Sequence, residues 1–352
     1  MRIFRYGWIV VGLMAASCAG RAASPGRVSP HAIPIPTPTP GEAGPAGVSL
    51  PSPMPTTTAR PISTPTPDPY ADLTIEALRR RAYGGGYIRL ERVLAVTPAF
   101  TRTLFTYLSD GLTIYGFMNI PQGKGPFPVV IVLHGYVDPA RYSTLAYTTR
   151  YADALARAGF LVLHPNYRNY PPSDEGPNMF RVGYAVDVLN LIAMLPTLPM
   201  ARADAVGLFG HSMGGGIALR VLTVNPTIRA AVLYGSMSAD ERRNFERILQ
   251  WSGGARGREE LSVPEEILRR ISPASYLQDI RTPIQIHHGA SDATVPPEWS
   301  RELYEQLRGL GKAVEWFEYP GQPHTFPAGS PADRLLLERS TAFFRKHVGR
   351  NP

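Results

Sequence analysis

Short apolar runs separated by helix-like stretches dominate the chain from about residue 70 onward. Runs typical of strands buried on both faces occur at 127–133, 160–163, 205–209, 230–234 and 284–287, with a weaker run at 314–318. Two apolar stretches on either side of Asp110-Gly111 predict a hairpin over residues 104–120.

Between these runs, apolar residues recur at helical spacing over 147–158, 179–195, 215–224, 299–310 and 334–347. Alternating strands and helices predict an α/β domain in which helices flank a mostly parallel sheet. Residues 237–275 interrupt the alternation with a charged, helix-prone insert. Its size suits a small helical lid over the rest of the domain.

The region before residue 70 has a different pattern. Residues 24–69 hold 14 of the 36 prolines of the chain and only four charged side chains. Proline fixes φ and removes a backbone donor, so neither a helix nor a sheet ladder propagates there. We interpret residues 18–69 as a disordered, semi-rigid tether and residues 70–352 as one globular domain. A proline-rich ligand or a glycosylated stalk are the alternatives for the tether.

Residues 1–17 have the layout of a signal peptide. Arg2 and Arg5 precede an apolar run over residues 8–16, which is too short to cross a membrane. Residues 15–18, Ala-Ala-Ser-Cys, resemble a bacterial lipoprotein box, in which the cysteine accepts the lipid, although such boxes usually carry Leu where Ala15 stands. We therefore expect lipid attachment at Cys18 and an extracytoplasmic protein anchored to the cell membrane. An ordinary secretion signal or an uncleaved anchor are the alternatives.

Composition and charge exclude several other classes. With 44% hydrophobic and 18% charged residues, the chain is too apolar to be disordered throughout. Cys18 is its one cysteine, so intrachain disulfides and multi-cysteine metal sites are excluded. The net charge is +8, but the basic residues form no run that would follow a phosphate backbone. Nucleic-acid binding is therefore not indicated, and nothing suggests a metal or an organic cofactor.

The candidate chemistry begins at residues 210–214, Gly-His-Ser-Met-Gly. The motif follows the buried run at 205–209 and opens a helical segment, so strand, sharp turn and helix succeed one another. That context is the one a nucleophile elbow requires. The flanking Gly210 and Gly214 remove side chains that would collide, and the turn exposes the hydroxyl of Ser212 at a helix N-terminus. Ser212 is the candidate nucleophile.

A serine hydroxyl needs a base to take its proton and an acid to orient that base. Asp292 and His324 each lie in a loop after a buried strand. They follow the serine in the order serine, acid, histidine, which is the chain order in proteins with this type of nucleophile elbow. Asp240 is the rival acid. His287, His288 and His347 are the rival bases, the first two being expected to pack at the end of a strand.

The tetrahedral intermediate of acyl transfer needs two amide donors. One is expected from the backbone N–H of Met213, directly after the nucleophile, and the other from the loop after 127–133, with the Tyr136 N–H favoured. His134 is expected to shape that loop. Tyr167 and Arg168 end another strand, so they either line the site as substrate contacts or pack on the rim of the sheet.

Taken together, residues 210–215, Asn166-Tyr167-Arg168, Ser272-Pro273 and the two loops that carry Asp292 and His324 resemble the catalytic domain of the prolyl oligopeptidase family. That group of serine peptidases has the α/β-hydrolase fold, and the similarity covers roughly residues 100–348. It implies Ser212 as nucleophile, Asp292 as acid, His324 as general base and an acyl-enzyme intermediate.

This sequence departs from the family pattern in two ways. Peptidase members usually carry a β-propeller, for which residues 70–100 are too short, and many have two glycines after the oxyanion-loop histidine, where the second position here is Tyr136. We therefore expect a serine hydrolase that acts on small esters or short peptides and amides, with a carboxylesterase or dienelactone-hydrolase-like enzyme as the alternative. An acyltransferase with the same triad and a non-catalytic, surface-anchored binding protein are further alternatives.

Overall fold

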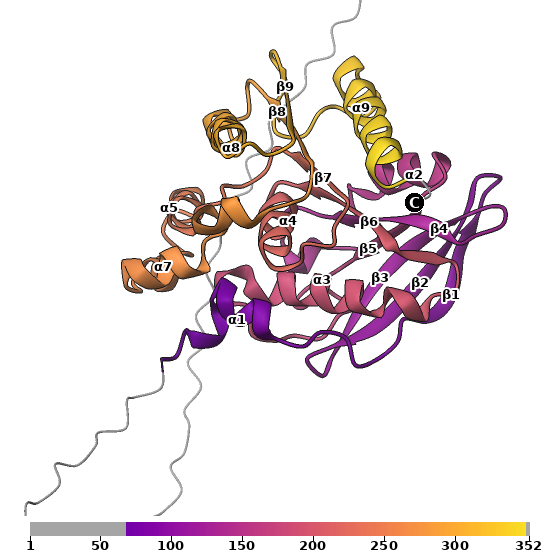
Figure 1. Ribbon diagram of the computed structural model, residues 1–352, viewed down its shortest axis with the longest axis horizontal. Helices are drawn as coiled ribbons and strands as arrows, with labels where there is room; N and C mark the ends of the chain where they lie inside the picture. Colours follow the sequence, from indigo (N-terminus) through magenta and orange to yellow (C-terminus); the bar gives the residue numbers. More distant parts are fainter. Residues whose placement is uncertain (1–67, 350–352) are drawn as a thin grey trace, which may run out of the picture. The chain divides into compact units, whose positions relative to one another are not determined.

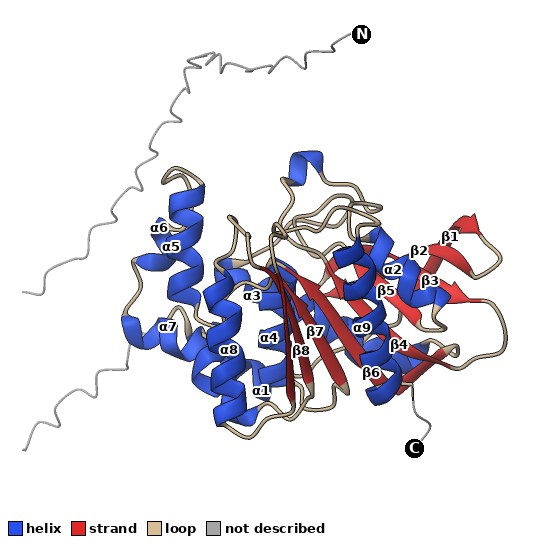
Figure 2. Ribbon diagram, turned by 90° about the horizontal axis from the view of Figure 1, so that it is seen from above, coloured by secondary structure: helices blue, strands red, loops and turns tan. Residues whose placement is uncertain are grey.

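The computed structural model describes residues 68–349, so the predicted signal peptide, Cys18 and nearly all of the predicted tether lie outside the described residues. The described part holds a nine-stranded sheet with helices on both faces (Figures 1 and 2). The strands are β1 (Arg89–Val96), β2 (Phe100–Ser109), β3 (Leu112–Pro121), β4 (Phe127–Leu133), β5 (Leu161–Pro165), β6 (Ala201–His211), β7 (Ala230–Tyr234), β8 (Ile284–Gly289) and β9 (Val314–Tyr319).

The sheet has the order β1-β2-β3-β5-β4-β6-β7-β8-β9. Strands β5, β4 and β6 to β9 pair in parallel, whereas β1, β2 and β3 form an antiparallel extension at one edge. The predicted α/β fold with a mostly parallel sheet is therefore confirmed. The predicted hairpin is β2–β3, and its turn residues Asp110 and Gly111 both have positive φ, at 55° and 81°.

Helices cover both faces of this sheet (Figure 2). The α-helices are α1 (Ile75–Arg80), α2 (Thr149–Arg157), α3 (Val182–Met194), α4 (Met213–Val224), α5 (Glu241–Trp251), α6 (Arg258–Leu261), α7 (Glu265–Ile271), α8 (Pro297–Gly309) and α9 (Pro331–His347). Short 3₁₀ helices are η1 (Ala71–Leu73), η2 (Pro139–Arg141), η3 (Met179–Arg181), η4 (Leu195–Thr197) and η5 (Pro273–Asp279).

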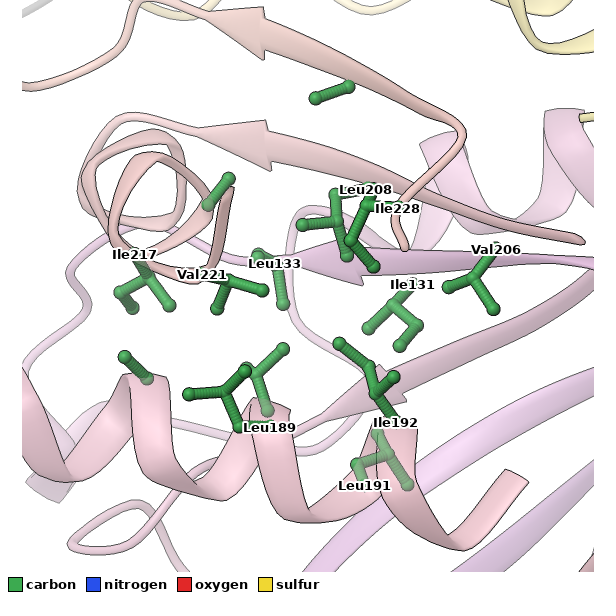
Figure 3. Packing of buried hydrophobic residues seen from close by; sticks show 14 of the residues in the cluster. Ile131, Leu133, Leu189, Leu191, Ile192, Val206, Leu208, Ile217, Val221 and Ile228 are labelled. Atoms are coloured by element: carbon green, nitrogen blue, oxygen red, sulfur yellow. The ribbon is translucent and has the colours of Figure 1, made fainter. Parts of the chain in front are cut away.

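Alternate side chains of the central strands enter separate core clusters. Ile131 of β4 packs with Leu189 of α3 and Ile217 of α4 on one face (Figure 3). Val132, its neighbour in the chain, belongs to the cluster that contains Phe344 of α9. Because both faces of β4 are covered, all of its interior positions must be apolar, which explains the continuous apolar run in the sequence.

The predicted helical insert is confirmed as α5, α6 and α7, which lie between β7 and β8 in the chain. A third apolar cluster joins it to α1 and to the start of α3. An ion pair also joins α5 to α4, because Arg220 Nη2 lies 2.7 Å from Glu241 Oε1 with both side chains almost fully buried. The insert is thus packed firmly against the helices of the domain.

Candidate active site

Ser212 occupies the turn between β6, which ends at His211, and α4, which begins at Met213. Its backbone has φ 56° and ψ −118°, a conformation that non-glycine residues rarely adopt. Hydrogen bonds hold the turn: the Ser212 N–H donates to Tyr234 O at 2.9 Å, and Ser212 O accepts from the Gly215 N–H at 2.9 Å. The residue is 9% exposed and stands at the N-terminus of a 12-residue helix.

The glycines of the elbow allow this close approach. A Cβ at Gly214 would lie 2.1 Å from the carbonyl oxygen of Leu133, and one at Gly210 would lie 2.5 Å from Gly214 O. Both contacts are with backbone atoms, which have little freedom to move away. The two positions therefore require glycine, and the elbow predicted from the sequence is confirmed as a backbone conformation.

Asp292 and His324 are brought together by the loops that follow β8 and β9. His324 Nδ1 lies 2.6 Å from Asp292 Oδ2, while Asp292 Oδ1 accepts hydrogen bonds from the N–H groups of Thr294 and Val295 at 2.8 and 2.9 Å. The side chain of Asp292 is buried and that of His324 is partly exposed. Because Nδ1 of His324 faces the carboxylate, its Nε2 is the nitrogen that is left for a reacting group.

His288 is a second partner of the Asp292 carboxylate. Its Nε2 lies 3.0 Å from Asp292 Oδ2, and its Nδ1 lies 2.7 Å from the Ser300 hydroxyl. Burial alone would raise the pKa of Asp292, but the hydrogen bonds from His288 and His324 outweigh that effect and hold the pKa well below its ordinary value. We predicted that His288 packs at a strand end; it is buried, and it also supports the acid. In the sequence, the one indication of this contact is that His288 lies four residues before Asp292.

The two expected oxyanion donors lie in the loop after β4, which holds Tyr136, and at the start of α4, which begins at Met213. Within residues 68–349, the backbone N–H groups of Tyr136 and Met213 have no hydrogen-bond acceptor, so both are available to a ligand. His134 is fully buried behind the loop, and its ring nitrogens lie 2.7 Å from Gly135 O and 2.9 Å from Asn166 O. Burial lowers the pKa of His134 to about 4, and the ring packs behind the loop as predicted.

A cavity of about 920 Å³ is lined by Ser212, Met213, Tyr136 and His324 together with side chains of the insert. The insert contributes apolar or aromatic side chains, among them Phe245, Ile248 and Trp251, and also charged side chains of Arg247, Arg256, Arg258, Glu259 and Glu260. This volume is within the range of small-molecule sites. The insert therefore forms one wall of the site, as the lid predicted from its size would.

Three contacts tie the insert to the loops that line the site. The ring of Trp251 meets the ring of Tyr136 edge to face at 5.4 Å, and the guanidinium of Arg256 lies 4.5 Å from the Tyr136 ring centre. On the other side, Arg247 Nε donates to the carbonyl oxygen of Thr294 at 2.9 Å, next to the acid. None of these contacts could be predicted from the sequence, because each joins residues far apart in the chain.

The rival residues lie elsewhere. Asp240 caps α5 by accepting a hydrogen bond from the Arg242 N–H at 2.8 Å. His287 is buried, with its ring nitrogens 2.8 Å from the Tyr319 hydroxyl and from Gln285 Oε1. His347 ends α9 and lines a different cavity. None of the three lines the cavity that contains Ser212.

The prediction that Tyr167 and Arg168 contact substrate is contradicted by their burial. Tyr167 is fully buried and stacks on His134 at 4.4 Å between ring centres. Arg168 is 4% exposed, and its guanidinium donates to the Asp187 carboxylate, with one nitrogen 2.8 Å from Oδ1. Both residues pack on the rim of the sheet, which is the alternative given in the sequence analysis. Tyr167 has φ 69°, so the chain turns directly after β5, away from the course of the strand.

Among residues 68–349, no group of three or more His, Cys, Asp or Glu side chains is arranged to hold a metal ion. The arrangement of Ser212, His324 and Asp292, with two unpaired amide donors beside the serine, suits nucleophilic acyl transfer.

Comparison with known proteins agrees with this chemistry. The sequence model of the dienelactone hydrolase family matches residues 114–347. The uncharacterized peptidase YtmA of Bacillus subtilis strain 168 is 27% identical over 227 residues, which is 63% of this chain and 85% of the relative.

Solved structures share the fold. The acylaminoacyl peptidase of Pyrococcus horikoshii superposes with a TM-score of 0.59 at 20% identity, covering 72% of this chain and 43% of the peptidase, so this chain spans less than half of that relative. Acetyl xylan esterase 1 of Thermoanaerobacterium sp. JW/SL YS485 superposes with a TM-score of 0.57 at 18% identity, covering 76% of this chain and 92% of the esterase. Both likenesses concern the α/β-hydrolase fold that was predicted.

Proposed function

The chain belongs to the dienelactone hydrolase family, and on that premise we propose that Ser212, His324 and Asp292 are the catalytic triad of this serine hydrolase. The proposal is carried by the way in which the three residues are brought together. Ser212 has a strained elbow backbone and lines the same cavity as His324, whose Nδ1 is 2.6 Å from a buried carboxylate. The substrates that we propose are small esters and short peptides or amides.

The reaction follows from these positions. His324 Nε2 takes the proton of the Ser212 hydroxyl as Oγ attacks the substrate carbonyl carbon, and Asp292 stabilises the imidazolium that forms. The N–H groups of Tyr136 and Met213 bind the negative oxygen of the tetrahedral intermediate. His324 then protonates the leaving alcohol or amine, which leaves an acyl group on Ser212. A water molecule, deprotonated by His324, hydrolyses that acyl-enzyme.

A carboxylesterase without peptidase activity is the second candidate. The side chains of Phe245, Ile248 and Trp251 support it, because apolar side chains of a cavity bind the acyl or alcohol part of an ester. Comparing p-nitrophenyl acetate with acyl-aminoacyl p-nitroanilides separates the two candidates. Turnover of the ester alone favours the carboxylesterase, and turnover of both favours the broader hydrolase.

A fluorophosphonate probe tests the enzyme itself. We expect it to label the folded protein and to leave Ser212→Ala unlabelled, and we expect the same variant to lose almost all ester hydrolysis. Labelling without hydrolysis would favour an acyltransferase, which needs an acceptor other than water. If the folded wild-type protein is not labelled, the enzyme proposal is wrong and a non-catalytic binding protein is the remaining alternative.

We also propose that the enzyme acts outside the cytoplasm, held to the cell membrane by a lipid on Cys18 and separated from it by the proline-rich tether. The support is the sequence of residues 1–69 alone. Metabolic labelling with palmitate should mark the wild-type protein and not Cys18→Ser, and the variant should leave the membrane fraction. Equal labelling of both would rule out this attachment, and secretion of unlabelled wild-type protein would favour an ordinary signal peptide.

A further inference from the structure

The Tyr147 hydroxyl joins three segments that meet at the proposed triad. It lies 2.8 Å from the backbone nitrogen of Gly135 in the oxyanion loop and 2.8 Å from Nδ1 of His211, the residue before Ser212. On the far side of the same imidazole, His211 Nε2 lies 3.2 Å from the carbonyl oxygen of His324. One continuous chain of hydrogen bonds therefore runs from the oxyanion loop, past the elbow, to the loop of the proposed base.

The direction of each hydrogen bond in this chain follows from the end groups. A carbonyl oxygen only accepts, so His211 Nε2 must carry the proton that is donated to His324 O. Burial, followed by the nearby charge of His324, lowers the pKa of His211 well below its ordinary value, so the ring is neutral and Nδ1 is an acceptor. Tyr147 therefore donates its hydroxyl proton to Nδ1, and its oxygen accepts from the Gly135 N–H. Burial raises the pKa of Tyr147, which keeps that hydroxyl protonated.

Gly135 is held on both sides of its Cα. Its N–H donates to Tyr147, and its carbonyl oxygen lies 2.7 Å from His134 Nδ1. The Gly135 carbonyl and the Tyr136 N–H belong to one planar trans peptide and point in opposite directions. The His134 ring therefore holds the peptide that carries the Tyr136 N–H, the Tyr147 hydroxyl holds the peptide before it, and together they fix the direction of this proposed oxyanion donor.

The packing around Gly135 leaves no room for another arrangement. A Cβ at this position would lie 2.4 Å from the Tyr147 hydroxyl and 2.9 Å from Cβ of Ser212. The oxyanion loop therefore lies directly against both Tyr147 and Ser212. A small shift of the loop would change the distance between the donor and the reacting carbonyl, on which oxyanion stabilisation depends.

We infer that Tyr147 is a positioning residue of the proposed hydrolase: its hydroxyl holds Gly135 so that the Tyr136 N–H faces the oxyanion, and it fixes the tautomer of His211 beside the nucleophile. The inference rests on the proposed function. It assigns Tyr147 a role in the transition state without any contact with the reacting atoms. The ring of Tyr147 lines the cavity, but removal of its hydroxyl alone keeps that ring, so binding of the ground-state substrate, which does not depend on the oxyanion donor, should change little.

Tyr147→Phe tests this inference, because it removes one oxygen atom and keeps the ring. Removing a whole oxyanion donor lowers kcat about 10²- to 10³-fold, so loosening one should lower the kcat for p-nitrophenyl acetate about 10- to 100-fold. KM should stay within about twofold of wild type, because ground-state binding is unchanged. The inhibition constant of phenylboronic acid, which forms a tetrahedral adduct on the serine, should rise by a factor similar to the loss in kcat.

Tyr107→Phe is the matched control, since it also removes the hydroxyl of a tyrosine. That hydroxyl donates a hydrogen bond of 3.0 Å to Asp187 O, and Tyr107 does not line the cavity. Thermal unfolding of both variants separates a loss of folding from a loss of positioning. A kcat within about twofold of wild type in Tyr147→Phe would overturn the inference, and so would a lower kcat with an unchanged inhibition constant. A wild-type protein that neither hydrolyses the ester nor reacts with the fluorophosphonate would overturn the proposed function itself, whereas an active wild type with an equally active Tyr147→Phe removes only the role of Tyr147.

Discussion

Asp292→Asn should weaken both catalysis and folding, because the carboxylate accepts hydrogen bonds from donors on both of its oxygens. Oδ2 faces the ring nitrogens of His324 and His288, and Oδ1 faces the N–H groups of Thr294 and Val295. An asparagine has one oxygen and one NH₂ group, so in either orientation its NH₂ meets two donors. Only one of the two pairs of donors therefore keeps a hydrogen-bond acceptor.

The magnitude of both losses can be estimated from these contacts. If His324 turns or changes its tautomer to avoid the amide NH₂, its Nε2 no longer takes the serine proton, and kcat should fall about 10⁴-fold. Two hydrogen bonds to a charged group are lost, each worth about 1.5 kcal/mol or more, so the free energy of unfolding at pH 7 should fall by about 3 kcal/mol. For a domain of this size, that lowers Tm by about 6–12 °C.

The stability difference should depend on pH in a definite direction. The folded pKa of Asp292 is held below the unfolded value of about 3.9, so the carboxylate stabilises the wild type above that pH and loses this contribution as pH falls through the folded pKa. The gap between wild type and Asp292→Asn should be greatest from pH 6 to 8 and shrink below about pH 4. Urea unfolding followed by circular dichroism across this range, with p-nitrophenyl acetate hydrolysis at pH 7, measures both effects.

Asp240→Asn is the control for this experiment. Asp240 caps α5, and asparagine caps helices about as well as aspartate, so we expect unchanged kcat and a change in stability below about 0.5 kcal/mol. If Asp292→Asn keeps wild-type kcat, or if the stability gap is the same at pH 3.5 and pH 7, the reasoning about the charged carboxylate is wrong. A loss of kcat in Asp240→Asn instead would move the acid to that residue.

Other substitutions test the elbow, the insert and the buried ion pair. Gly214→Ala places a Cβ 2.1 Å from a backbone carbonyl of β4 and should cost about 3 kcal/mol or more in urea unfolding, whereas Gly216→Ala, with its nearest contact at 3.5 Å, should be close to neutral. Trp251→Ala removes part of one cavity wall and should raise kcat/KM for p-nitrophenyl decanoate relative to the acetate by about tenfold; an unchanged ratio would show that this wall does not limit the acyl group. Arg220→Met leaves the buried Glu241 with one partner fewer and should lower the free energy of unfolding by about 3 kcal/mol, which a stability equal to wild type would contradict.

The buried strands were predictable because both of their faces are covered. Strands β4 and β7 have the same bounds as their apolar runs, 127–133 and 230–234. Strand β1 was not predicted, because it lies at the edge of the sheet and most of its side chains, such as Arg89, Glu91 and Arg92, are exposed. Its position depends on pairing with β2, and a local pattern carries no information about that pairing. Helix α1 was not predicted either, since its six residues are too few to show helical spacing.

The site was predictable to the extent that its residues follow strands directly. Ser212, Asp292 and His324 each occupy the loop after a recognisable strand, and the parallel sheet brings those loops to one edge. The same rule failed for Tyr167 and Arg168, because a strand end fixes where the backbone emerges and not which way each side chain turns.

Tyr147 shows what no sequence pattern could have provided. Its partners, Gly135 and His211, lie 12 and 64 residues away in the chain, and neither spacing corresponds to a regular structural period. The hydroxyl meets them only because the fold brings the segment before α2 to the ends of β4 and β6. Contacts of this kind depend on the assembled sheet, so the residues around the triad are harder to predict than the triad itself.

Several of the residues that shape the substrate cavity lie on the insert, whereas the residues proposed to carry out the reaction do not. Phe245, Ile248 and Trp251 lie in one short stretch of α5 and contribute to the cavity wall, while the proposed triad and oxyanion donors lie on loops after the strands or at the start of α4. A mutant library at Phe245 and Ile248 would vary the fit of the acyl or alcohol group, whereas changes at Trp251 would also remove its contact with the Tyr136 ring. Arg247, on the same helix, must be kept, because it bonds the loop of the acid. Directed evolution of this domain toward new substrates therefore has a compact and well-defined starting point.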